Sequence, residues 1–229
     1  MTSSGSDSHV RGERLKIGVL ISGRGSNLQA LIDACANPDF PAEIALVMSN
    51  KADAFGLERA KSAGIATQVI SHRDFPGDKR AFEEAMDAAL RAAGVEMVCL
   101  AGFMRLLSPW FVNAWHDRLI NIHPSILPSF KGLDTHERAI EAGVRFHGCT
   151  VHYVRAEMDA GPIIVQAAVP VLQGDDPHSL GDRVLESEHR IYPLAVRLIA
   201  EGRARVDGDR VSITGVDEAG LGSLSNPPY

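Results

Sequence analysis

The fold of this chain is indicated most directly by residues 15–28, which read LKIGVLISGRGSNL. Leu15–Ile21 is a short apolar run with Val and Ile, which is typical of a strand buried on both faces. Residues 22–25 supply two glycines and a serine, and are typical of a turn. Ser26–Ala36 then places apolar residues at helical spacing. The stretch therefore predicts a buried strand, a glycine turn and a helix.

The same alternation continues through the first half of the chain. Further strands are predicted at residues 44–48, 66–70 and 97–101, and further helices at residues 55–63 and 79–93. Strands and helices that alternate with short connections are typical of a mostly parallel sheet covered on both faces.

The pattern changes after residue 109, where two β-rich segments are separated by a tight turn at residues 159–162. Strands are predicted at residues 118–122, 146–154 and 163–171, and helices at residues 135–142 and 178–200. We therefore predict a single α/β domain with a Rossmann-like, mostly parallel sheet flanked by helices and an antiparallel portion in its second half. We expect residues 14–214 to form this domain, with a flexible leader at 1–13 and a flexible tail at 215–229.

Composition excludes several classes of protein. The chain has 229 residues and a formal net charge of −6, which argues against general electrostatic binding of nucleic acid. No apolar run approaches the roughly 18 residues of a membrane-spanning helix, and no signal peptide is evident. The three scattered cysteines Cys35, Cys99 and Cys149 fit neither a disulfide framework nor a zinc ribbon. We expect a cytoplasmic protein with no nucleic-acid or membrane partner.

Gly25, Ser26 and Asn27 follow the first predicted strand, at the strand end where ligands collect in parallel sheets. Glycine lets a ligand approach the backbone, and the free N–H groups of a helix start favour an anion. The dinucleotide fingerprint is incomplete because Leu28 replaces its third glycine. A monophosphate site and an ordinary helix start both remain open at this point.

Residues 121–125 read Asn-Ile-His-Pro-Ser and end a predicted strand. The strand period of two places the side chains of Asn121 and His123 on one face, and Pro124 keeps the backbone extended up to the imidazole. This pair suits acyl-group chemistry, because the amide stabilises an oxyanion and the ring carries a proton near neutral pH. Asp159, in the later turn, is the candidate carboxylate for keeping the ring protonated. Alternatively, His123 and Asp159 are ordinary loop and turn residues.

Other chemistries are poorly supported by residue spacing. There is no Gly-x-Ser-x-Gly nucleophile motif, and Cys149 is expected to point inward from a strand. His136 and Glu137 lack the second histidine of a zinc-protease helix. His147 and His152 are five residues apart, which places them on opposite faces of the predicted strand. We therefore predict no metal site.

Several motifs occur together in the order expected of one family. They are residues 17–28, Leu100-Ala101-Gly102-Phe103-Met104-Arg105, residues 121–128 (Asn-Ile-His-Pro-Ser-Ile-Leu-Pro), Gly132, Thr135-His136, His152 and Asp159-Ala160-Gly161-Pro162-Ile163. Over residues 15–203 the chain resembles the phosphoribosylglycinamide formyltransferases, which are folate-dependent enzymes of purine synthesis.

The resemblance implies that the formyl group of 10-formyltetrahydrofolate, as co-substrate, is transferred to the amine of glycinamide ribonucleotide through a tetrahedral intermediate. It implies that the catalytic residues are Asn121, His123 and Asp159. It implies that the ribonucleotide is bound by Gly25, Ser26, Asn27 and Glu188. It also implies folate-pocket walls that comprise Met104, Arg105, Leu106, Leu107, Val154 and Met158. The expected partners are the two small-molecule substrates and, in a weak homodimer, a second copy of the chain.

The family pattern leaves two points open. Related sequences often carry a histidine where this chain has Asp134, so the role of Asp134 is open, and His136 is interpreted as structural. Lys79 and Arg80 are equal candidates for a basic residue that meets folate, although a solvated helix start explains both.

Three other functions share parts of this pattern. A formyltetrahydrofolate hydrolase would use the same residues with water as acceptor, but usually carries an amino-terminal domain that a 13-residue leader does not supply. A methionyl-tRNA formyltransferase usually has a carboxyl-terminal domain and more positive charge for RNA. A non-catalytic ribonucleotide- or folate-binding module would gain little from keeping Asn121, His123 and Asp159 together.

Overall fold

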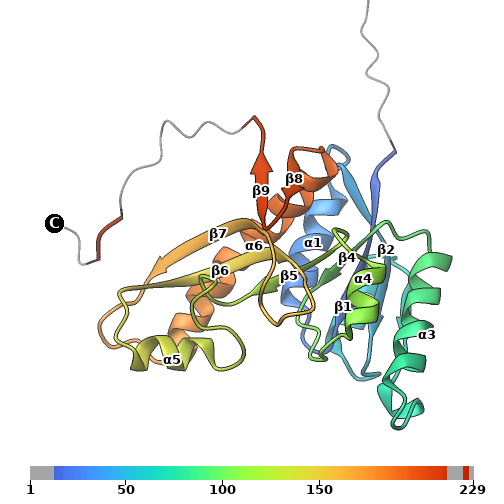
Figure 1. Ribbon diagram of the computed structural model, residues 1–229, viewed down its shortest axis with the longest axis horizontal. Helices are drawn as coiled ribbons and strands as arrows, with labels where there is room; N and C mark the ends of the chain where they lie inside the picture. The colour runs from blue at the N-terminus through green and yellow to red at the C-terminus, as the bar shows by residue number, and fades with distance from the viewer. Residues whose placement is uncertain (1–12, 216–223, 227–229) are drawn as a thin grey trace, which may run out of the picture.

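The computed structural model describes residues 13–215 and 224–226 (Figure 1). The predicted leader at residues 1–13 lies outside the described residues apart from residue 13. The predicted tail at residues 215–229 overlaps them only at 215 and 224–226. The flexibility of both segments therefore stays a prediction. Within the described residues, no helix has the length and apolar character needed to cross a membrane.

A seven-stranded sheet has the order β3-β2-β1-β4-β5-β6-β7. Its strands are β1 (Leu15–Ile21), β2 (Ala42–Ser49), β3 (Thr67–Val69), β4 (Met97–Leu100), β5 (Leu119–His123), β6 (Phe146–Tyr153) and β7 (Ile163–Pro170). The first five strands pair in parallel, whereas β6 runs antiparallel to β5 and to β7. The predicted fold class, including its antiparallel second half, is confirmed.

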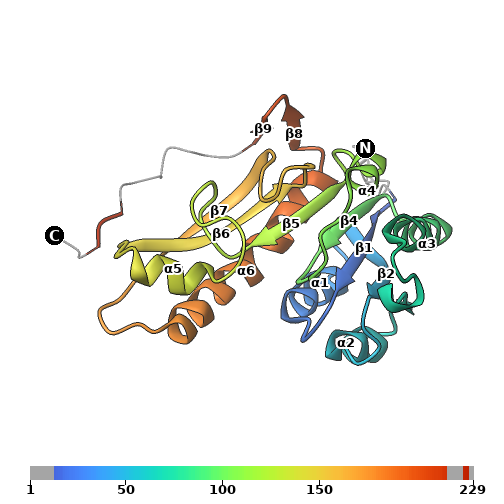
Figure 2. The same ribbon diagram turned by 60° about the horizontal axis from the view of Figure 1, so that its bottom comes forward.

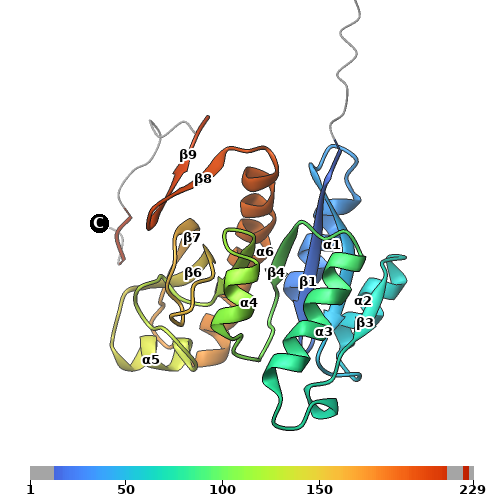
Figure 3. The same ribbon diagram turned by 45° about the vertical axis from the view of Figure 1, so that its right-hand side comes forward.

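Helices cover both faces of the sheet. They are α1 (Ser26–Ala36), α2 (Phe55–Ser62), α3 (Lys79–Ala92), α4 (Pro109–Ala114), α5 (Thr135–Glu141) and α6 (Pro177–Ala200). Apolar side chains of α1, α2, α5 and α6 belong to one buried cluster, and those of α3 and α4 to a second. Figure 2 shows α1 and α6 beside each other, and Figure 3 shows α3 and α4 together on the opposite face.

The central strand β1 is buried on both faces, as its continuous apolar run predicts. Ile17, Val19 and Ile21 contribute to the cluster under α1 and α6, and Leu20 contributes to the cluster under α3 and α4. Gly18 permits close packing of α3, since a Cβ there would lie 2.6 Å from the Leu90 side chain. The glycine turn therefore follows the carboxyl end of a fully buried inner strand.

Sequence patterns miss the shortest elements. These are α4, a 3-10 helix at His72–Asp74, and the hairpin of β8 (Ala204–Asp207) and β9 (Arg210–Ile213). The start of α4 carries a capping signal, because the Ser108 side chain accepts a hydrogen bond from the Phe111 N–H and Pro109 follows it. Six residues are too few for a helical periodicity to stand out.

Gly148 provides a test of strand packing in the antiparallel part. A Cβ at this position would lie 1.9 Å from the carbonyl oxygen of Ala167 on β7. We expect Gly148→Ala to lower the free energy of unfolding by about 2 kcal/mol or more, because a backbone oxygen in a sheet does not rotate away. Gly23→Ala is the control, since its Cβ would meet nothing within 4 Å. Urea unfolding that gives equal losses for both variants would contradict this account.

Candidate active site

Strand β5 carries Asn121 and His123 to the carboxyl end of the parallel part of the sheet. His123 is 6% exposed. Its Nδ1 lies 3.5 Å from Oδ1 of Asp159, and its Nε2 lies 3.1 Å from the backbone oxygen of Phe130. The structure therefore brings His123 and Asp159 together, although 36 positions separate them in the sequence.

Asp159 is held by its own backbone and by a neighbouring loop. It has a left-handed backbone conformation, with φ of 48°. Its Oδ2 accepts a hydrogen bond from the Gly132 N–H at 2.7 Å. Gly161 allows this turn to close, because a Cβ there would lie 2.1 Å from the backbone oxygen of Tyr153. One carboxylate oxygen is thus fixed by Gly132, and the other faces the imidazole.

Both nitrogens of His123 face acceptor oxygens. A neutral imidazole has one N–H, so the ring donates to both Asp159 and Phe130 only when it carries both protons. A substrate oxygen that accepts from Nε2 must replace the Phe130 carbonyl. In this structure Asp159 therefore occupies Nδ1 of the ring, and the Phe130 carbonyl occupies Nε2.

Asn121 is oriented by a residue that sequence reasoning did not assign to the site. Its Nδ2 lies 3.4 Å from Nε2 of His152, which is its partner across the antiparallel pair of β5 and β6. Nδ1 of His152 lies 3.0 Å from the backbone oxygen of Tyr153. Burial lowers the pKa of His152, so the neutral ring accepts from Asn121 and donates to Tyr153. Cross-strand register is the signal that could have found His152.

Two more histidines pack beside this group. The rings of His136 and His147 are perpendicular, with centroids 5.3 Å apart, and the ring of Phe130 contacts His147 edge-on. Burial and the nearby His123 lower the pKa of His136. Burial, and to a smaller extent the nearby His136, lowers the pKa of His147 to about 4. Both rings therefore stay neutral near pH 7. Asp134 has a left-handed backbone at the start of α5 and makes no side-chain cap.

The glycine turn is formed by close contact between two helices. Gly25 has φ of 71°, and a Cβ there would lie 2.7 Å from the Cα of Gly56 in α2. Ser26 and Asn27 then open α1. Asn27 donates from Nδ2 to Oε2 of Glu188 at 2.7 Å, so the structure joins these two predicted substrate-binding residues from α1 and α6.

Glu188 is a buried carboxyl group with an altered acidity. It is 6% exposed, and burial raises its pKa to about 7, partly opposed by the hydrogen bond from Asn27. The Oδ1 atom of Asn27 is buried and has no hydrogen-bond partner among the described residues. The acceptor capacity of that oxygen is therefore unused within the described residues.

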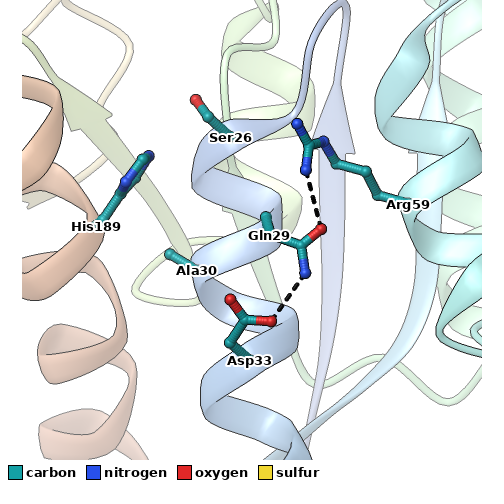
Figure 4. A pocket seen from close by; sticks show the side chains of 6 residues that line it. All are labelled: Ser26, Gln29, Ala30, Asp33, Arg59 and His189. Atoms are coloured by element: carbon teal, nitrogen blue, oxygen red, sulfur yellow. Dashed lines mark hydrogen bonds between the residues drawn. The ribbon is translucent and has the colours of Figure 1, made fainter. Parts of the chain in front are cut away.

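A pocket opens beside the first turn of α1 (Figure 4). It is lined by Ser26, Gln29, Ala30, Asp33, Arg59 and His189. Arg59 reaches across from α2, donating from Nε to the backbone oxygen of Arg24 and from Nη1 to the side chain of Gln29. Arg59 places a positive charge next to the glycine turn, and sequence reasoning did not single it out. Its spacing within α2 carries no signal for this role.

The predicted folate walls expose apolar side chains. Met104 is 69% exposed, Leu106 71% and Met158 53%. Leu107 and Val154 pack against the same apolar cluster, so the two walls meet the same side of the sheet. Single exposed apolar side chains are common on protein surfaces, so the assignment of these residues to a folate pocket stays a prediction.

The basic candidates near these walls differ in their contacts. Arg80 stacks on Trp110, 3.8 Å from the ring centre, and pairs with Glu84. Lys79 lies 4.0 Å from the buried Glu83. Both side chains therefore already have protein partners. Over residues 13–215 and 224–226, no group of three or more His, Cys, Asp or Glu side chains is arranged to hold a metal ion.

Residues 15–196 match the family model described as formyl transferase. The chain belongs to the formyl transferase family. It is 48% identical over 192 residues to phosphoribosylglycinamide formyltransferase of Escherichia coli (strain K12), a match that covers 84% of this chain and 90% of that relative. It also resembles the crystal structure of glycinamide ribonucleotide transformylase 1 from Symbiobacterium toebii, with a TM-score of 0.87, 50% identity, and coverage of 92% and 99% of the two chains.

Longer members of this formyl transferase family contain the same region. The trifunctional purine biosynthetic protein adenosine-3 of Gallus gallus is 51% identical over 203 residues, which are 87% of this chain and 20% of the relative. The chain therefore spans about a fifth of the length of that trifunctional relative.

The raised pKa of Glu188 predicts a pH-dependent stability. Between about pH 4.5 and 7 the unfolded chain loses this proton while the folded formyl transferase keeps it, so the free energy of unfolding falls as pH rises. Glu188→Gln keeps an oxygen for Asn27 and removes the titration. We expect its stability relative to the native chain to rise by about 1 to 3 kcal/mol between pH 5 and pH 8. Urea unfolding at the two pH values measures this; a constant difference would contradict it.

Proposed function

We propose that this chain transfers the formyl group of 10-formyltetrahydrofolate to the amine of glycinamide ribonucleotide. The observation that carries the proposal is the contact of His123 with Asp159 beside Asn121, at the open end of β5. Membership of the formyl transferase family supports the same reaction, since relatives named for it cover most of the chain.

In the proposed reaction the substrate amine attacks the formyl carbon, and negative charge develops on the formyl oxygen. Asn121 and protonated His123 stabilise that oxygen more strongly in the transition state than in the neutral carbonyl, which lowers the barrier. Asp159 keeps the imidazole in its orientation and stabilises its protonated form. It also helps to pass the amine proton through water to the departing folate nitrogen. Binding both substrates side by side removes much of the entropic barrier.

The ribonucleotide occupies the side of the site formed by α1, α2 and α6. Backbone N–H groups at Gly25, Ser26 and Asn27 hold the phosphate, as free amides at a helix start suit an anion. Arg59 adds a compensating positive charge at the pocket edge. Glu188 binds the substrate together with Asn27, to which it is hydrogen-bonded.

The formyl-folate donor lies between the two apolar walls. Met104, Leu106 and Leu107 form one wall, and Val154 and Met158 form the other, consistent with an aromatic pteridine as occupant. Arg105 is exposed on the same segment and supplies a cation for the carboxylates of the donor. That the reaction uses no metal ion stays a prediction. A cytoplasmic location and a weak homodimer stay predictions.

Acceptor dependence tests the proposed reaction against its rivals. We expect purified protein to consume 10-formyltetrahydrofolate only when glycinamide ribonucleotide is present, because the bound amine is the nucleophile. Absorbance of the folate product and mass spectrometry of the formylated ribonucleotide provide the measurement. Equal consumption without ribonucleotide would identify a hydrolase, and binding of both ligands without any turnover would identify a non-catalytic module.

Substitution of His123 separates catalysis from binding. We expect His123→Ala to lower kcat by about 100- to 1,000-fold, the usual loss for one oxyanion donor, while the Kd for glycinamide ribonucleotide changes little. Gly25→Ala should do the reverse, since its Cβ forces apart the backbone at the phosphate position. His116→Ala, at an exposed histidine paired with Asp117, is the matched control. Unchanged turnover in His123→Ala would rule out its proposed role.

A further inference from the structure

The segment that joins β4 to α4 is irregular, yet it is attached to the protein at both ends. Residues 101–108 contain no helix or strand, and they present Met104 and Leu106 to solvent. A segment of this kind is expected to sample many conformations unless buried groups restrain it. Two buried side chains supply that restraint, one from the residue after β1 and one from α3.

Ser22, which directly follows β1, holds the first end. Its Oγ accepts a hydrogen bond from the Met104 N–H at 2.8 Å and donates to Oδ1 of Asn50 at 2.6 Å. Its own N–H donates to the backbone oxygen of Gly102 at 3.1 Å. Ser22 is 5% exposed and Asn50 is 3% exposed, so these bonds are protected from exchange with water.

Glu83 of α3 holds the second end. Its Oε1 accepts from the Ser108 N–H at 2.7 Å, and its Oε2 accepts from the Ser108 hydroxyl. The Glu83 side chain is 1% exposed, and the Lys79 ammonium lies 4.0 Å away. Burying a carboxylate is unfavourable unless donors compensate it, and two of its three compensating groups belong to the residue that follows the folate wall.

We infer that Ser22 and Glu83 are positioning residues for the formyl-folate donor, because they hold residues 104–107 in the binding conformation before the donor arrives. This inference rests on the proposed function, which assigns those residues to the folate wall. Ser22 binds the Met104 backbone at one end, and Glu83 binds the backbone N–H and the hydroxyl of Ser108 at the other. Because residues 104–107 are ordered before the donor binds, binding does not carry the entropic cost of ordering them, and the affinity for the donor is higher.

Three substitutions at Glu83 and its neighbour test the inference. Glu83→Met removes the acceptors while it fills the buried volume, and it leaves the Ser108 N–H and hydroxyl without their partner, which costs stability. We expect it to raise the KM for 10-formyltetrahydrofolate about tenfold or more, which corresponds to roughly 1.4 kcal/mol, with the KM for glycinamide ribonucleotide within twofold of native. Glu83→Gln should restore near-native values, since its amide both accepts from the Ser108 N–H and donates to the hydroxyl. Glu84→Gln, at the exposed neighbour in α3, is the matched control.

Ser22→Ala removes the acceptor for the Met104 N–H at the other end of residues 104–107. It tests the same inference independently if Glu83→Met does not fold. It should produce the same selective rise, and amide hydrogen exchange should accelerate within residues 102–108 in both variants. A rise shared equally by both substrates, or an unchanged KM for the donor, would overturn the inference in favour of a purely structural role.

Calorimetric binding of tetrahydrofolate separates this inference from the proposed reaction. Native protein that binds tetrahydrofolate without turnover would contradict the proposed reaction alone. In that case a Kd at least tenfold weaker in Glu83→Met or Ser22→Ala would still support the positioning role, and an unchanged Kd would overturn it.

Discussion

The antiparallel pairing of β5 with β6 is the constraint on which the candidate site depends. It sets His152 opposite Asn121 and Thr150 opposite His123. Because β6 runs antiparallel to β5, β6 ends beside the start of β5, where Tyr153 pairs with Ile120. The turn after β6 then carries Asp159 back to His123 at the end of β5. A parallel neighbour at this position would require a long crossover instead. The reversal of direction at β5 therefore converts two distant stretches into one group around the imidazole.

A buried polar network keeps the intervening loop in register with this pair. The Thr150 hydroxyl donates to the backbone oxygen of Ser125 and accepts from the Leu127 N–H, and Gln166 donates to both Thr150 and Leu127. These bonds fix the loop that supplies the Phe130 oxygen and the Gly132 N–H. Since a buried hydroxyl is costly when unpaired, a shift of the loop would break several bonds at once. The site geometry is thus tied to the stability of β6 and β7.

Local sequence pattern predicts most of the helices and strands, but it does not predict most of the side-chain contacts that form the site. Leu15–Ile21 and Ser26–Ala36 have the bounds that their periodicity predicts, because burial on both faces and helical spacing are properties of neighbouring residues. Asn121 and His123 were identifiable for the same reason. Arg59, His152 and Glu83 were not, since their roles arise from strand register and helix packing between distant segments. The bond from Asn27 to Glu188 is also beyond local pattern, because it joins α1 to α6 across 161 positions of sequence.

The four histidines around β5 differ in their surroundings. Burial lowers the pKa of His136, His147 and His152, so these rings are neutral near pH 7. Of the four, and within the described part of the chain, His123 is the ring with a carboxylate oxygen inside 4 Å. A cation at any of the other three would repel a cation at His123 within a poorly solvated region. The three neutral rings therefore add no positive charge beside His123, and the Asp159 carboxylate faces its Nδ1. The other nitrogen, Nε2, faces the Phe130 carbonyl oxygen at 3.1 Å, so any ligand oxygen that accepts from Nε2 has to displace that carbonyl.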